Sequence, residues 1–114
     1  MKEIKAHVRP ECLASIVSRL EQEGARDLTV TRVDAIGALA DSEKDRLRLF
    51  RNNAEKYSDI AKVELVCADV EVNRFVSVLR EASFTGERGD GRIFVVNVER
   101  AVNIRTGDED EKAL

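Results

Sequence analysis

The chain has 114 residues, of which 43% are hydrophobic and 36% are charged, and its formal net charge is -3. This length suits one domain, which we take as residues 1–114, and the composition is too apolar for a disordered chain. An acidic balance without a basic face or an aromatic-rich strand argues against nucleic acid as a ligand. We expect a cytoplasmic protein, because the N-terminus lacks a signal-peptide core and no apolar run approaches the roughly 20 residues that span a bilayer.

The first third of the chain reads as strand, helix and strand. Residues 4–8 alternate apolar and polar side chains, as in a strand with one buried face. Apolar residues at three- and four-residue spacing then predict an amphipathic helix, with Pro10 in its first turn and Gly24 at its end. Residues 28–33 are rich in β-branched side chains and predict a second strand.

A charged segment, residues 37–59, follows the second predicted strand. It is long for a connection within a small domain, and such loops are usually functional or disordered. A short helix over residues 42–51 and a solvated charged loop are both compatible with this composition.

The second half of the chain repeats the pattern of strand, helix and strand. Residues 60–67 predict the third strand, and apolar spacing over residues 72–79 predicts a second helix, which we expect Asp69 to cap. Residues 92–98 predict the fourth strand, and a tail over residues 101–114 ends in a run of acidic side chains.

The order βαββαβ predicts an α+β, ferredoxin-like fold, with an antiparallel four-stranded sheet and both helices on one face. The other face would then lack a helical cover and would carry apolar side chains such as Val66, Val96 and Val98. Because large exposed apolar patches mark interfaces, we expect this face to be buried against other copies in a closed homo-oligomer.

Three glycines precede the fourth strand in the stretch Thr-Gly-Glu-Arg-Gly-Asp-Gly-Arg at residues 85–92. Glycine allows positive φ angles and close backbone approach, and successive amides aimed into one concavity bind anions such as phosphate. Arg88 and Arg92 can neutralise phosphate, since an arginine fork holds two oxygens at once. A glycine-rich turn without any ligand would show the same pattern, so both interpretations stand.

This turn, together with the tail, resembles the C-terminal signature of P-II signal-transduction proteins. The matching segments are residues 85–94, 104–107 and 113–114, with Met1-Lys2, Arg9-Pro10, Gly24 and residues 28–31 near the start. The resemblance implies a homotrimeric regulator without catalytic activity, built from ferredoxin-like subunits. Such proteins bind ATP or ADP in clefts between subunits, and they act on a membrane transporter or metabolic enzyme through a T-loop, here about residues 37–59.

The resemblance also implies a nucleotide site. It places Thr29 beside the adenine, Gly37 at the base of the T-loop near the phosphates, and Lys62 at the phosphates. Arg105 matches the second of two family arginines in the tail, and Asn103 replaces the first. Without the resemblance, Lys62 and Arg105 could be ordinary surface charges. The residues that it places against phosphate and ribose from the turn are Gly89, Asp90, Gly91 and Arg92. No resident metal is expected from the sequence, and the involvement of Mg²⁺ stays open.

The T-loop departs from the family pattern. Family members that sense 2-oxoglutarate with Mg-ATP carry glutamine at the position of Leu39 and arginine at that of Ala38, so both residues argue against 2-oxoglutarate sensing. The counterpart of the segment that is uridylylated in relatives, residues 50–55, has no tyrosine. These departures suggest a branch that regulates a non-ammonium transporter or a metal efflux system. The partner and the sensed effector are not determined by the sequence.

Two other functions fit part of the sequence. A weak nucleotide hydrolase would use Asp90 or Glu64 to orient water, although a nucleophile constellation and a paired-carboxylate metal site are lacking. A metal-responsive trimer would need more ligands than His7 and two distant cysteines, Cys12 and Cys67, which we interpret as buried free thiols.

Overall fold

The computed structural model describes residues 1–37 and 58–114. Its helices and strands are β1 (Lys2–Val8), α1 (Leu13–Gln22), β2 (Thr29–Ala35), β3 (Ser58–Cys67), α3 (Val72–Ser83) and β4 (Gly91–Asn97). Short 3-10 turns precede both helices at Pro10–Cys12 and Asp69–Glu71, and another, Asp110–Ala113, lies in the tail. The helix considered for residues 42–51 lies outside the described residues. Neither α1 nor α3 is long and apolar enough to cross a membrane.

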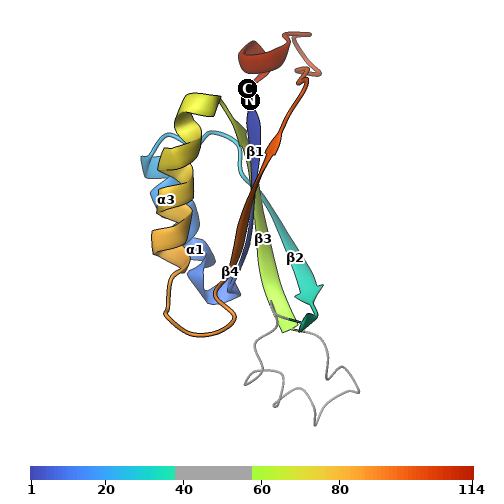
Figure 1. Cartoon of the computed structure of the whole chain (residues 1–114). Coiled ribbons are helices and arrows are strands. Elements are labelled where there is room, and N and C mark those ends of the chain that lie inside the picture. The colour runs from blue at the N-terminus through green and yellow to red at the C-terminus, as the bar shows by residue number, and fades with distance from the viewer. Residues whose placement is uncertain (38–57) are drawn as a thin grey trace.

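The strands form one antiparallel sheet in the order β2-β3-β1-β4. The chain passes over the sheet twice, between β1 and β2 and between β3 and β4, and α1 and α3 lie on the same face (Figure 1). The predicted α+β, ferredoxin-like arrangement is therefore confirmed. As a consequence of this topology, the end of β1 lies beside the start of β4 at one end of the sheet, toward which β2 also runs, whereas the tail lies beyond the other end (Figure 1).

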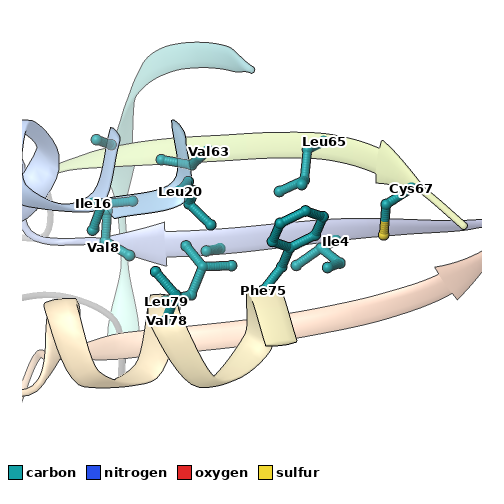
Figure 2. Packing of buried hydrophobic residues seen from close by; sticks show 12 residues of the cluster. Ile4, Val8, Ile16, Leu20, Val63, Leu65, Cys67, Phe75, Val78 and Leu79 are labelled. Atoms are coloured by element: carbon teal, nitrogen blue, oxygen red, sulfur yellow. The ribbon is translucent and has the colours of Figure 1, made fainter. Parts of the chain in front are cut away.

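The hydrophobic core fills the space between the sheet and the two helices (Figure 2). The sheet contributes Ile4, Ala6, Val8, Ala61, Val63, Leu65 and Cys67, and the helices contribute Ile16, Leu20, Phe75, Val78 and Leu79. The period of two in the strands and of three to four in the helices directs these side chains into one layer. Burial of each large apolar side chain contributes about 1.5–3 kcal/mol of stability. Cys67 is buried and Cys12 half-buried, and both are free thiols.

The predicted cap of the second helix was wrong. Asp69 is the first residue of the 3-10 turn that leads into α3, and the N–H of Ala68 at the cap position donates to Glu71 Oε2 at 3.1 Å. Asp69 instead forms an ion pair with the amino group of Met1 at 2.9 Å. Because β1 and β3 are antiparallel neighbours, the start of β1 lies beside the end of β3, and a positive charge there competes for the carboxylate.

The face of the sheet away from the helices has no cover within the part of the chain that the structure describes. Phe94 and Val96 of β4 lie on this face and are each 44% exposed, and Val66 of β3, across β1 from Val96, is half-buried. Paired charges interrupt the predicted apolar surface: Lys5 with Glu3 at 3.0 Å, and Lys62 with Glu64 at 2.8 Å. The open face is therefore mixed rather than purely apolar.

Candidate functional site

The turn between α3 and β4, residues 84–90, is folded around the carboxylate of Asp90. Oδ2 of Asp90 accepts hydrogen bonds from the backbone N–H groups of Thr85 at 2.9 Å and of Gly86 at 3.0 Å. Oδ1 accepts from the hydroxyl of Thr85 and from Nε of Arg9, the latter at 3.2 Å. The carboxylate of Asp90 is thus engaged by donors of the protein itself.

These contacts set the ionisation of Asp90. Burial raises its pKa, but the hydrogen bonds from Thr85, Arg9 and Gly86 outweigh burial and lower the pKa to about 2. Asp90 is therefore ionised at neutral pH, and the adjacent guanidinium of Arg9 neutralises its charge.

Arg9 ties the turn to the end of β1. It is only 8% exposed, and in addition to its ion pair with Asp90 its Nη2 donates to the carbonyl of Arg88. From the sequence, Arg9 is only part of the P-II resemblance and is not among the predicted site residues. One feature of the sequence could have pointed to it. Arg9 directly follows a strand with a predicted buried face, and a charged residue at such a place is rarely buried unless its charge has a partner.

Gly91 fixes the exit of the turn. Its φ is +108°, and a Cβ at this position would lie 1.7 Å from the carbonyl oxygen of His7 and 2.8 Å from its carbonyl carbon. Because the obstructing atoms belong to the backbone of β1, only glycine fits here. Gly89, with a φ of +94°, also has the positive φ that the glycine spacing predicted.

Some of the backbone amides that were predicted to bind an anion form hydrogen bonds within the turn instead. The amides of residues 85–87 donate to side chains of the turn itself. By contrast, no acceptor among the described residues binds the N–H of Arg88 or of Gly89. These two amides, with the exposed side chain of Arg88, are the donors that the turn leaves to an anion.

The sheet register places Lys62 and Arg92 in one row on the open face. His7 lies between them, opposite Lys62 on β3 and opposite Arg92 on β4. Their backbones are thus two strand spacings, roughly 10 Å, apart. Arg92 is exposed, whereas Lys62 is paired with Glu64, and this hydrogen bond lowers the pKa of Glu64. Burial and the nearby Lys62 lower the pKa of His7, which leaves its ring neutral at pH 7.

Gly37 lies at the same end of the sheet as the turn. It follows β2 by two residues, is exposed and has a φ of +86°. Ala38 and Leu39, which carry the argument about 2-oxoglutarate, lie outside the described residues, as does most of the T-loop.

Thr29 lies about midway along the sheet, on the edge strand farthest from β4, because its row continues through Glu64 and Lys5 to Phe94. It begins β2, whose seven residues separate its two ends by about 20 Å. Thr29 lies opposite Glu64 and, with Glu64 and Val66, lines a hollow of about 500 Å³. The other acidic residues of this lining are Glu3, Asp27, Glu71 and Glu111, whereas the only cationic side chain among the described lining residues is Arg26. The hollow is therefore acidic.

Arg105 lies in the tail, residues 101–114, and the tail lies beyond the end of the sheet opposite to the glycine-rich turn (Figure 1). Asn103 Oδ1 accepts hydrogen bonds from the amides of Arg105 at 3.0 Å and of Thr106 at 3.1 Å, so Asn103 shapes the turn that carries Arg105. The structure therefore places Gly37, Lys62 and the glycine-rich turn toward one end of the sheet and Arg105 beyond the other, with Thr29 between them on the edge opposite the turn. Within the described part of one chain, Thr29 and Arg105 are thus separated from the turn.

Comparisons with known proteins show to which family the chain belongs. The family model described as "Nitrogen regulatory protein P-II" matches residues 1–108. The chain belongs to the P-II family. One curated relative, nitrogen regulatory protein P-II of Pasteurella multocida (strain Pm70), is 37% identical over 117 residues, and the alignment covers all of both chains. Nitrogen regulatory protein GlnK of Escherichia coli (strain K12) is 32% identical over 116 residues, again across both whole chains.

A solved structure supports the same assignment. The crystal structure of Arabidopsis thaliana PII bound to citrate matches with a TM-score of 0.81 and 30% identity, covering 99% of this chain and 91% of that one. The resemblance to P-II proteins is therefore confirmed along with the fold. Because the curated relatives are named as regulatory proteins, this P-II protein is a signal-transduction regulator and not an enzyme.

The structure also bears on the two alternative functions. The carboxylates that a hydrolase would need are already paired, Asp90 with Arg9 and Glu64 with Lys62. Within residues 1–37 and 58–114, no group of three or more metal-ligating side chains comes together.

Proposed function

We propose that this P-II protein binds ATP or ADP between the copies of a cytoplasmic homotrimer and regulates a partner through its T-loop. The observation that carries the proposal is the turn before β4. There, the amides of Arg88 and Gly89 are open, Arg88 and Arg92 are exposed, and Arg9 neutralises the carboxylate of Asp90, which leaves Glu87 as the other carboxylate of the turn. Backbone donors and arginines suit a phosphate group.

The distribution of charge supports one orientation of the nucleotide. The charged side chains that line the hollow beside Thr29 are mostly carboxylates, which repel phosphate but accept an uncharged base and ribose. We therefore propose that the adenine lies beside Thr29 and that the phosphates lie at Gly37, Lys62 and the turn residues Gly89, Asp90, Gly91 and Arg92. Asp90 takes part by shaping the turn rather than by direct contact, since its carboxylate is already bound.

The separation of Thr29, on the far edge of the sheet, and of Arg105, in the tail, from the glycine-rich turn favours a site formed by two copies. Thr29 and Arg105 of one copy would lie against the turn end of a neighbour, so that Arg105 reaches phosphates held by the neighbour's Arg92. The exposed Phe94 and Val96 of the open face support oligomerisation, because their burial removes apolar area from water. A closed ring of identical contacts then repeats the same site around its axis.

The partner that we propose is a membrane transporter or a metabolic enzyme. Ala38 and Leu39 lack the polar side chains that 2-oxoglutarate sensing requires in relatives, and this favours a transporter other than an ammonium channel, or a metal efflux system. The effector that is sensed together with the nucleotide would then be a molecule other than 2-oxoglutarate.

Calorimetric titration tests the nucleotide proposal. ATP and ADP should bind more tightly than AMP and adenosine, because the phosphates interact with the cationic turn. Titrations with and without Mg²⁺, and with added 2-oxoglutarate, determine whether either ligand strengthens binding. Absence of any heat from ATP and ADP at millimolar concentration would contradict the proposal.

Complementation tests whether two copies form the site. Arg92→Gln and Arg105→Gln should each weaken ATP binding when present in every copy. If the two variants are unfolded together and refolded as mixed oligomers, about a quarter of the sites should regain both arginines, because each arginine comes from a different copy. Recovery of no sites in oligomers shown to be mixed would place both arginines in the same chain.

A further inference from the structure

We infer that Arg9 is a positioning residue for the phosphate-binding turn, because it orients the Arg88–Gly89 peptide so that the N–H of Gly89 faces the ligand. The inference rests on the proposed nucleotide binding. It assigns a role to a residue that lies outside the predicted site.

The geometry of one peptide unit carries the first step. Nη2 of Arg9 donates to the carbonyl oxygen of Arg88, and the described residues contain no cis peptide bond. In a planar trans peptide the C=O and the N–H point in opposite directions. Since the carbonyl of Arg88 points toward a guanidinium that is 8% exposed, the N–H of Gly89 points away from it, toward the outside of the turn. This N–H has no acceptor among the described residues.

A second contact from the same side chain fixes the other side of Gly89. Nε of Arg9 binds Oδ1 of Asp90 at 3.2 Å, and Asp90 in turn holds the amides at the start of the turn. One planar guanidinium therefore restrains the residues on both sides of Gly89. A lysine ammonium carries the same charge but lacks this fork, so it is a poor substitute at such a site.

The turn needs such a restraint because of its glycines. Gly86, Gly89 and Gly91 all have positive φ angles, and glycine-rich chains have many alternative conformations. Without an anchor the turn would have to be ordered when the ligand binds, and this ordering weakens affinity. The contacts of Arg9, which follows β1, order the turn before the ligand binds.

Arg9 also removes a repulsion. Asp90 is ionised at neutral pH, and its ion pair with Arg9 cancels a negative charge next to the proposed phosphate position. The two contributions are separable by substitution. Arg9→Lys keeps the charge and loses the fork, whereas Arg9→Gln loses the charge as well.

The test compares ATP with adenosine, which lacks phosphate, in the wild type, Arg9→Gln and Arg9→Lys. We expect Arg9→Gln to weaken ATP binding at least about tenfold, since hydrogen bonds to charged groups are strong, and Arg9→Lys to fall between Arg9→Gln and the wild type. Adenosine affinity should not change. Arg19→Gln is the matched control, because Arg19 forms an ion pair with Glu81 at 2.6 Å between the helices and should leave both affinities unchanged.

The NMR resonance of the Gly89 amide gives an independent readout in the free protein. It should shift in both Arg9 variants and stay in place in Arg19→Gln. If folded Arg9→Gln binds ATP as tightly as the wild type, the inference is overturned while nucleotide binding stands. Equal losses of ATP and adenosine affinity in the Arg9 variants would show that Arg9 has only a structural role, and this result would also overturn the inference. If the wild type binds no nucleotide, the proposed function is wrong. In that case the NMR resonance still tests the inference, because an unshifted Gly89 amide in Arg9→Lys would show that Arg9 does not orient the Arg88–Gly89 peptide.

Discussion

Two turns at opposite ends of the sheet use the same side-chain chemistry but are anchored differently. In residues 85–90, one oxygen of Asp90 accepts two successive backbone amides, and in residues 103–108 Asn103 does the same. Each turn also contains a threonine hydroxyl that is hydrogen-bonded to an aspartate, Thr85 with Asp90 and Thr106 with Asp108. In the proposed site each turn brings one arginine to the phosphates, Arg92 or Arg105.

The anchors of the two turns differ in burial. The first turn is tied to β1 by Arg9, which is 8% exposed. Near the second, Arg100 and Glu109 form an ion pair whose side chains are 69% and 56% exposed. Exposed ion pairs contribute only about 0–1 kcal/mol, whereas a buried charge with several hydrogen bonds contributes more. Similar local turns therefore gain different rigidity from what holds them to the rest of the fold.

The largest expected effect tests the close packing of the first turn on β1. Gly91→Ala should destabilise the folded protein by about 3 kcal/mol or more, because it combines a positive φ with a collision against the backbone of His7. Urea denaturation followed by circular dichroism measures the loss. Gly86→Ala is the control, since its Cβ would lie 3.6 Å from the ring of Phe84 and only the φ cost of about 1–2 kcal/mol applies. Equal losses would contradict the close approach at Gly91.

The next effect concerns the charge at the centre of the first turn. The pKa of Asp90 is lowered from 3.8 to about 2, so its ionised form stabilises the folded state above pH 3.8, and this contribution is lost as the pH falls toward 2. The lost stability is about 2 kcal/mol. Asp90→Asn should be less stable by a similar amount at pH 7 and should respond less to pH between 4 and 2. Urea midpoints at pH 7, 4 and 2.5 measure both.

Other carboxylates also titrate in this pH range. The pKa values of Glu64 and Asp69 are lowered in the wild type, but both residues are present in Asp90→Asn as well. The difference between the two proteins therefore isolates Asp90. Parallel pH profiles would show that its carboxylate does not hold the turn.

A smaller effect is expected in the second turn. Asn103→Ala removes the acceptor for the amides of Arg105 and Thr106 and should reduce stability by about 1 kcal/mol. Since Arg105 is then held less well, ATP affinity should also fall a few-fold. Asn103→Asp retains an acceptor oxygen and should behave like the wild type in calorimetry and thermal unfolding. Unchanged ATP affinity in Asn103→Ala, alongside a loss in Arg105→Gln, would mean that this turn does not position the arginine.

The smallest effect completes the contrast between the anchors. Glu109→Gln breaks the exposed pair with Arg100 and should lower stability by less than about 1 kcal/mol. The difference from the wild type should shrink in high salt, because exposed charges are screened. Thermal unfolding at low and high ionic strength measures it. A loss as large as that of Asp90→Asn would remove the distinction between the two ends of the sheet.

Much of the fold follows from local patterns in the sequence. The period of two in β1 and β3 and the helical spacing in α1 and α3 predicted the elements, because each pattern sets which side chains share a face. The spacing of Gly89 and Gly91 likewise predicted a turn with positive φ angles, a property of these residues themselves. The order of the elements then limited the topology to the ferredoxin-like one.

The tertiary structure decided which distant residues meet. Arg9 and Asp90 are 81 positions apart, and they come together only because β4 pairs with β1. Asp69 lost its predicted role as a cap because the same topology brings Met1 beside it. The separation of Thr29 from the glycine-rich turn also depends on strand order, because β2 and β4 are the two edge strands. Such contacts depend on strand order and register, which the whole core determines and no short segment encodes.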